Sequence, residues 1–358
     1  MRPARVCCML LCLLLVIALV GSADAKKKKH KGKRDKKEKV QLDDRQLKGH
    51  RFLRPFRFPL AIPTTNIGVG LGYAYSRWNW DEKLDLVIFN DDDFTQGGLN
   101  ETMDVEVEFL NRFSLELLLE GRALAGADEN SALLYGGQAL YSATFIPKVM
   151  LYQNDNWGSC FSISSDVIYD QGVQSSPIVL MVNLIENMTE LLEEIERKQE
   201  LPSERELRKV TNIKIQDALI TQDFLSIRPS LLIAQTIHPV LGLQVGIRYN
   251  YGIRETVDGP DMFDLDAGDP PSSLLIGSVL TFDLNPISRA HVGFKGELDY
   301  EMENDDGEDI RTIITGGGIM YTGRENLELG ATFFYETSDW EDLSYDLYYL
   351  ILNMRYFF

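Results

Sequence analysis

Apolar and polar residues alternate with a period of two along most of the chain after position 66. In one stretch, apolar residues occupy every odd position from Leu241 to Ile253, and glycine or polar residues occupy the even positions between them. Successive side chains of a β-strand point to opposite faces, so this period predicts strands rather than helices. Twelve strands are expected, at 66–78, 101–111, 113–126, 133–152, 157–170, 225–237, 240–254, 273–284, 289–302, 310–322, 326–337 and 345–358.

The lengths and connections of these strands favour a barrel that crosses a membrane. A strand needs about 9–11 residues to cross a bilayer obliquely, whereas strands of soluble proteins mostly have about 5–6. The connections at 79–100, 127–132, 171–224, 255–272, 303–309 and 338–344 are long or acidic, and the ones between them are tight. We therefore predict an all-β fold, a twelve-stranded antiparallel transmembrane β-barrel over residues 58–358. A soluble secreted β protein is the alternative, because its strands also alternate, with the apolar face buried.

A helical insert at about 172–224 interrupts the alternation. Its apolar residues recur at helical spacing from Met181 to Ile195, after a Ser-Pro pair suited to a helix start. A second short helix is expected to end near Thr211. Two arrangements stay open for this extracellular loop: the helices pack on each other and on the rim, or they cover the lumen. Glutamates on every turn after Asn183 speak against a membrane-spanning helix.

The last strand carries the most specific pattern. Its apolar face runs in steps of two from Tyr348 to Tyr356 and Phe358, where the chain stops. A terminal strand that ends on Phe resembles the closing strand of bacterial outer-membrane β-barrel proteins, although the glycine common there is missing. The resemblance implies that Tyr348, Tyr356 and Phe358 form a signal read by the barrel-assembly machinery. It also implies the outer membrane of a Gram-negative cell, with outer-membrane lipid and lipopolysaccharide as surroundings.

The start of the chain predicts export. Residues 1–25 have the charged start, apolar run and small-x-small end of a signal peptide. Its removal takes three of the four cysteines and leaves Cys160. Residues 26–57 follow with a net charge of +11, whereas residues 58–358 carry −30. We expect 26–57 to be a basic disordered periplasmic tail and linker. It could contact an acidic periplasmic polymer or the barrel mouth. A nucleic-acid partner is not expected for an exported chain without a folded basic face.

No catalytic or metal motif accompanies this architecture. The four histidines have no neighbouring serine and acid in a pattern typical of a catalytic triad, and no nucleophile elbow occurs. Acidic loops at Asp91–Asp93 and Asp261–Asp269 lack the spacing of an EF-hand. We therefore expect no enzyme activity, no metal site and no cofactor.

Function is predicted from the polar face of the strands. The lumen of a twelve-stranded barrel is wider than that of an eight-stranded barrel, whose interior side chains alone can fill. Acids outnumber bases on the expected lumen face, which favours a passive, porin-like channel for small polar or cationic solutes. The alternative is a closed barrel that acts as a structural or binding platform through its helical extracellular loop. The oligomeric state stays open. The lumen-facing candidates are Glu106, Glu116, Glu120, Arg122, Arg248, Arg254, Lys295, Glu297, Asp299, Glu301 and Arg355.

Overall fold

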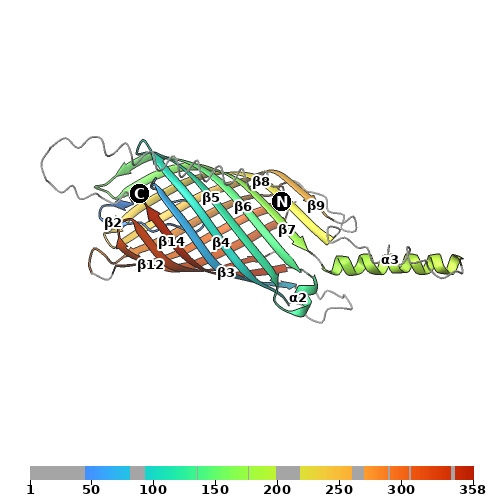
Figure 1. Cartoon of the computed structure of the whole chain (residues 1–358). Helices are drawn as coiled ribbons and strands as arrows, with labels where there is room; N and C mark the ends of the chain where they lie inside the picture. The colour runs from blue at the N-terminus through green and yellow to red at the C-terminus, as the bar shows by residue number, and fades with distance from the viewer. Residues whose placement is uncertain are drawn as a thin grey trace, which may run out of the picture. The chain divides into compact units, whose positions relative to one another are not determined.

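Twelve antiparallel strands close into one barrel in the computed structural model (Figure 1). The structure describes residues 45–80, 93–134, 136–175, 177–198, 218–259, 270–288, 291–305, 308–339 and 343–358. Each barrel strand pairs with the next along the chain, and the last strand closes the ring against the first. The strands are β3 (Asn66–Trp80), β4 (Asp93–Phe109), β5 (Phe113–Gly126), β6 (Gly137–Asn154), β7 (Ser159–Ser175), β8 (Leu219–His238), β9 (Leu241–Asp258), β10 (Ser272–Asp283), β11 (Val292–Asp305), β12 (Glu308–Arg324), β13 (Leu327–Asp339) and β14 (Leu343–Phe357). The prediction of an all-β barrel with twelve antiparallel strands is confirmed.

The barrel exposes its apolar face. Leu71 is 61% exposed and Leu352 is 65% exposed, and they are paired across β3 and β14. The residues that alternate with these apolar residues along the two strands face the lumen and are buried or half-buried, such as Ile351. A soluble sandwich would bury the apolar face and wet the polar one. This barrel does the reverse, which matches the surface that hydrocarbon requires.

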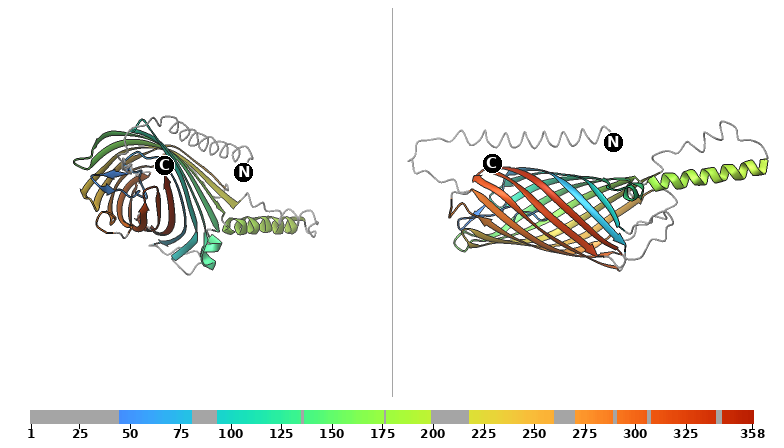
Figure 2. Two further views of the ribbon diagram at one scale, coloured as in Figure 1. Left: turned by 60° about the vertical axis from the view of Figure 1, so that its left-hand side comes forward. Right: turned by 90° about the horizontal axis from the view of Figure 1, so that it is seen from below.

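Two ends of the barrel are distinguished by their connections. At the turn end, short connections join β4 to β5, β6 to β7, β8 to β9 and β12 to β13, and β3 begins where β14 finishes. At the opposite, loop end lie the helices α2 (Glu129–Leu134) and α3 (Pro177–Lys198), with α3 following β7 (Figure 2). Among the described residues, no helix is both long enough and apolar enough to span a membrane.

The loop end differs in detail from the sequence-based expectation. The helix in the insert is confirmed as α3, but the insert is narrower, because β7 runs to Ser175 and β8 starts at Leu219. The second helix expected in the insert lies outside the described residues. Helix α2 occupies the connection predicted at 127–132 as an acidic loop. The Ser131 N–H and hydroxyl both donate to Asp128, which caps the start of α2.

Residues 45–65 lie inside the barrel, and we call this segment the plug. It begins with a hairpin of β1 (Gln46–Leu47) and β2 (His50–Arg51). The turn residues Lys48 and Gly49 have φ of 49° and 83°, as a type I′ turn requires. The hairpin sits at the turn end, where the backbone carbonyl of Glu325 accepts a 2.9 Å hydrogen bond from Arg45. From there the chain runs into the lumen and returns to start β3.

The structure of the plug contradicts the prediction of a disordered linker for residues 45–57, which are the described part of 26–57. Residues 45–57 are ordered and mostly buried or half-buried, apart from the exposed turn at Lys48 and Gly49, and the plug continues past the expected boundary at 57 into 58–65. The physical reason is that an arginine-rich and phenylalanine-rich segment has no core of its own, but the lumen supplies both apolar surface and carboxylates. The signal peptide, the lysine run and the rest of 1–44 lie outside the described residues, as do the acidic loops at 91–92 and 261–269.

Candidate functional site

The apolar side of the plug packs on the lumen wall near the turn end. Leu47, Phe52 and Phe58 are each at most 3% exposed, and they form one cluster with wall residues of β6, β7, β8 and β10. Burying a side chain of this size contributes roughly 1.5–3 kcal/mol. The hydrophobic effect therefore holds the plug inside the lumen.

Glycines in the wall make room for the plug. A Cβ atom on Gly242 would come within 2.6 Å of the Phe52 ring, and one on Gly246 within 3.0 Å of the Phe58 ring. Real Cβ atoms almost never approach that closely, so these two positions on β9 accept the rings because they have no side chain. The wall and the plug are thus complementary in shape.

Arginines of the plug are paired with carboxylates of the barrel. Arg45 lies 2.9 Å from Glu328, and Arg57 lies 3.4 Å from Glu301. Arg54 forms an ion pair with Glu116 and lies 3.7 Å from Asp104. Burial by itself lowers the pKa of Arg54, but Glu116 and Asp104 outweigh it and raise that pKa above its ordinary value. Arg54 is therefore charged at any physiological pH.

The backbone of the plug is hydrogen-bonded by lumen side chains. Glu297 accepts from the N–H groups of Phe56 and Arg57 at 2.9–3.1 Å. Lys295 donates to the carbonyl of Arg54 at 2.9 Å, and Gln244 to that of Leu53 at 2.8 Å. Buried peptide groups need such partners. Because they come from side chains, the plug needs no place in the barrel sheet.

A second polar centre anchors the end of the plug. The buried carboxylate of Glu106 lies 2.6 Å from Lys148 and accepts from the Thr64 hydroxyl at 2.9 Å and from Asn66 at 3.1 Å. Lys148 also donates to the carbonyl of Leu60 at 2.7 Å. This cluster fixes the point at which the plug turns into β3.

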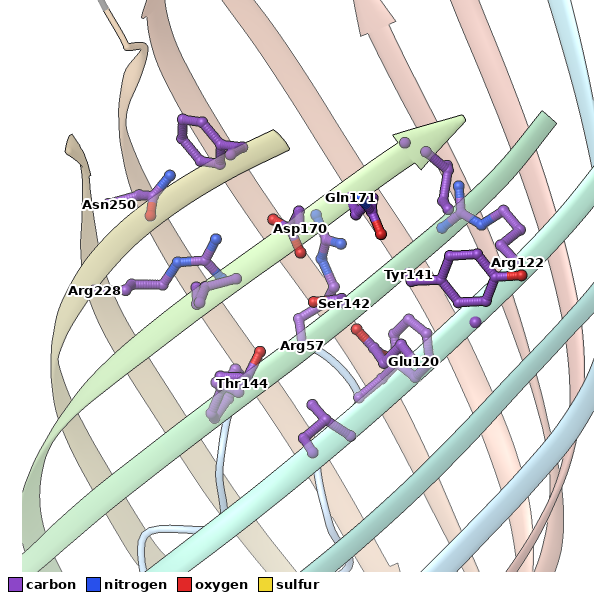
Figure 3. A pocket seen from close by; sticks show the side chains of 18 of the residues that line it. Arg57, Glu120, Arg122, Tyr141, Ser142, Thr144, Asp170, Gln171, Arg228 and Asn250 are labelled. Atoms are coloured by element: carbon purple, nitrogen blue, oxygen red, sulfur yellow. The ribbon is translucent and has the colours of Figure 1, made fainter. Parts of the chain in front are cut away.

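A cavity of about 510 Å³ lies beyond the plug toward the loop end (Figure 3). Phe56, Arg57 and Phe58 of the plug form its floor, and the walls come mainly from β5 to β9. Strand register places Glu120, Ser142 and Asp170 side by side on β5, β6 and β7. The candidate site is this cavity together with the plug that closes it at the turn end.

Comparison with known proteins supports the fold. The sequence matches no protein-family model and no curated protein sequence. In structure, the chain is similar to an outer-membrane channel from Pseudomonas putida F1, with 10% identity, a TM-score of 0.50, and 86% of this chain and 100% of that chain covered. It is also similar to the translocator domain of the autotransporter NalP from Neisseria meningitidis, with 9% identity, a TM-score of 0.45, and 82% and 89% covered. The likeness to the channel from Pseudomonas putida F1 shows that the chain resembles bacterial outer-membrane β-barrels in fold.

The residues predicted from sequence to face the lumen occupy several environments. Glu106, Glu116, Glu297, Glu301 and Lys295 contact the plug. Arg248 donates to the plug carbonyl of Arg57 and pairs with Asp166, and Arg355 pairs with Asp104. Asp299 is fully buried, and neither of its carboxylate oxygens has a hydrogen-bond partner among the described residues. Glu120 and Arg122 line the cavity.

Arg254 is the exception among these candidates. A register shift between β8 and β9 leaves one residue of β9 unpaired, so that Glu255 comes opposite Phe224 and lines the cavity. Arg254 is exposed and lies opposite Leu225. The prediction that Arg254 faces the lumen is therefore wrong, because a bulge reverses the alternation beyond it.

The predicted assembly residues lie on the outer side of β14. Tyr356 and Phe358 are exposed, with their rings edge to face at 5.0 Å, and the Tyr348 ring lies 5.0 Å from that of Tyr335. Their recognition by an assembly machinery stays a prediction.

Sequence reasoning missed the plug, Lys148, Asp166, Asp170 and Arg228. The plug had one signal, which is that its arginines alternate with phenylalanines and leucines from Arg51 onward. Large apolar side chains are unfavourable in a solvated linker, where they would be exposed to water. The four wall residues had a weaker signal, because each is a single charge at a lumen-facing position of a strand.

Proposed function

We propose that this chain is a channel of the bacterial outer membrane that its own plug closes at the turn end. The observation that carries the proposal is that the plug packs inside the lumen near the turn end without joining the barrel sheet: its hairpin forms a separate two-stranded sheet. The plug can therefore leave without breaking a strand pair of the barrel. The turn end then faces the periplasm, as in barrels of this type.

The solute preference of the open state follows from the plug's ion pairs. When the plug leaves, Asp104, Glu116 and Glu301 lose the positive charges of Arg54 and Arg57. Carboxylates of one sign around a lumen favour cations. Small polar or cationic solutes are thus the expected permeants, and no catalytic step is part of this function.

The decisive experiment locks the plug to the wall. The Sγ atom of Cys160 on β7 lies 3.7 Å from the carbonyl oxygen of Ala61 in the plug. The variant Ala61→Cys introduces a second thiol at the residue whose carbonyl Cys160 contacts, and oxidation should cross-link the plug to β7, as checked by thiol titration. We expect conductance in planar bilayers to be abolished after oxidation and restored by a reductant. The matched control is Ala61→Cys with Cys160→Ser, whose conductance should not change on oxidation or on reduction. Equal conductance of the oxidised and reduced protein would refute gating by the plug.

A closed barrel that serves as a binding platform is the second candidate. Four apolar residues of α3 (Met181, Ile185, Met188 and Leu192) are 42–62% exposed at helical spacing, as a contact surface for another protein would be. If neither the wild-type protein nor the reduced variant conducts at any voltage, this platform function is favoured over the channel.

A further inference from the structure

Four charged side chains that line the cavity make no ion pair within the described part of the chain. They are Arg122, Arg228, Glu120 and Asp170. The other charged side chains that line the cavity have partners. Arg54, Arg57 and Arg248 form ion pairs with carboxylates of the barrel, and Glu255 accepts a 2.6 Å hydrogen bond from Gln222. Glu303 also has a partner.

The four side chains surround one space. Glu120 and Asp170 each lie opposite Ser142 in the β5–β6 and β6–β7 registers, so their strands are about 10 Å apart. Arg122 is the next lumen-facing position along β5 toward the loop end. Arg228 lies nearer the turn end, opposite Asp166 on β7. A row of two carboxylates is therefore flanked by a guanidinium group on each side, as Figure 3 shows.

The environment of each arginine leaves room for a ligand. The guanidinium of Arg122 lies 4.8 Å from the centre of the Tyr349 ring, which covers one face and leaves its edge unpaired, and its Nε atom is buried without an acceptor. Arg228 lies near the charges of Arg248 and Arg57, which repel it, and near those of Glu301 and Asp166, which attract it. An arginine in such a setting offers a planar array of donors to a carboxylate.

A ligand with both charges pairs with both kinds of group. Glu120 lies near the charges of Arg57 and Arg122, and Asp170 near that of Arg228, so a simple anion would compete with these carboxylates for the arginines and a simple cation would compete with the arginines for the carboxylates. Unpaired charges away from bulk water are costly, so a ligand that pairs both kinds gains most. The lining also includes apolar residues, such as Leu118, Ile168 and Phe224, beside polar ones, and these apolar residues can contact a hydrocarbon group.

We propose that the cavity binds a zwitterionic solute of the amino-acid or short-peptide class with an apolar side chain. One of the two flanking arginines, Arg122 or Arg228, holds its carboxylate, and Glu120 and Asp170 hold its ammonium group. This ligand assignment rests on the proposed channel function. It makes the cavity the first binding site that a solute meets on its path through the channel.

The first test uses three probes that share the isobutyl side chain of leucine. Leucine carries both charges, 4-methylpentanoate lacks the ammonium group, and 3-methylbutylamine lacks the carboxylate. Calorimetric titration of the folded full-length protein in detergent should show leucine binding at least about tenfold more tightly than either analogue, because each analogue lacks a charge-assisted hydrogen-bonding group. Equal affinity for leucine and 4-methylpentanoate would make the site an anion site and overturn the proposal.

The second test assigns the two ends of the ligand. One of the variants Arg228→Gln and Arg122→Gln should lower leucine affinity about tenfold and leave binding of 3-methylbutylamine unchanged, which identifies the arginine that holds the carboxylate. Asp170→Asn and Glu120→Gln should lower leucine affinity similarly and leave 4-methylpentanoate unchanged. The matched controls are Arg254→Gln, beside the cavity but exposed, and Glu101→Gln, exposed on β4 opposite Gly121. Both should bind leucine as the wild type does. Equal losses for all three probes in one variant would indicate misfolding, which the change in gel mobility on heating detects independently.

The two proposals fail in different ways. If no probe binds but the cross-linked variant still gates conductance, the ligand assignment is wrong and the channel stands. If leucine binds with the expected preferences but no state conducts, the channel is wrong and the binding site stands.

Discussion

At the scale of residues, the lumen is organised by buried ion pairs that join distant parts of the chain. Lys148 and Glu106 are at most 1% exposed, and the pair is bonded on both sides to the end of the plug. Such a pair adds little stability over an apolar pair, but loss of one partner leaves a buried charge uncompensated. These pairs therefore specify where the plug lies.

Replacing Lys148 should reveal this cost. Lys148→Met leaves Glu106 buried without a counter-charge and should destabilise the folded barrel by about 3–5 kcal/mol, as measured by urea unfolding in lipid vesicles. The double variant Lys148→Met, Glu106→Gln should recover most of the loss, because no charge is then buried alone. A single variant as stable as the wild type would contradict the role of this pair.

His50 makes the docking of the plug depend on pH. Burial lowers the pKa of His50 to about 4, although a hydrogen bond to the Pro239 carbonyl and the charge of Asp283 oppose the shift. The ring is thus neutral when docked, whereas the undocked ring titrates near 6.5. The undocked state binds more protons between these values, so docking is strongest above about pH 6.5 and weakens toward pH 4, by roughly 3 kcal/mol in all.

The measurement compares open probability in bilayers at pH 7 and pH 4.5. Acidification should open the wild type more than His50→Gln, since carboxylates that titrate in this range are common to both proteins. Identical pH responses of the two proteins would show that His50 does not control docking.

At the scale of elements, the strands were predictable and the plug was not. A period of two over ten or more residues is a local property, so all twelve strands could be found, and even the closing strand was placed within two residues at its start. The starts of β4 and β8 were set several residues too late, because Gly97, Gly98 and polar residues near them break the alternation locally. The plug has no period, and its contacts lie up to 283 residues away, as between Arg45 and Glu328. Only the closed barrel creates its surroundings.

The fit between plug and β9 leads to a prediction about glycine. Gly242→Ala pushes a methyl group into His50 and Phe52, and such overpacking typically costs about 1–3 kcal/mol. We expect faster protease cleavage of the plug in the folded protein and a higher open probability. Gly296→Ala on β11 is the control, because a Cβ there meets nothing within 4 Å. Equal cleavage rates in the two variants would argue against tight packing of the plug.

At the scale of the whole molecule, one strand closes the barrel and also reaches the plug. β14 pairs with both β13 and β3, and the backbone N–H of Phe358 donates to Thr65 at the end of the plug. The last residue of β14, Phe357, and the residue after it, Phe358, differ in the direction of their side chains. Phe358 is exposed on the outer face, whereas the ring of Phe357 lies 3.5 Å from the guanidinium of Arg45 in the plug. The last two residues therefore connect assembly of the barrel with closure of its turn end.

Separate substitutions of these residues should separate the two roles. Phe358→Ser removes the outer aromatic end of β14 and should lower the amount of heat-modifiable barrel in the outer-membrane fraction several-fold, while the molecules that do assemble conduct as the wild type does.

Phe357→Ser keeps the outer face but removes the cation–π contact with Arg45, which is worth about 0.5–2 kcal/mol. It should assemble at normal levels and open more often in bilayers. The gel shift of unboiled samples measures assembly, and single-channel recording measures opening. Normal assembly of Phe358→Ser would disprove the terminal signal, and wild-type opening of Phe357→Ser would show that this contact does not hold the plug.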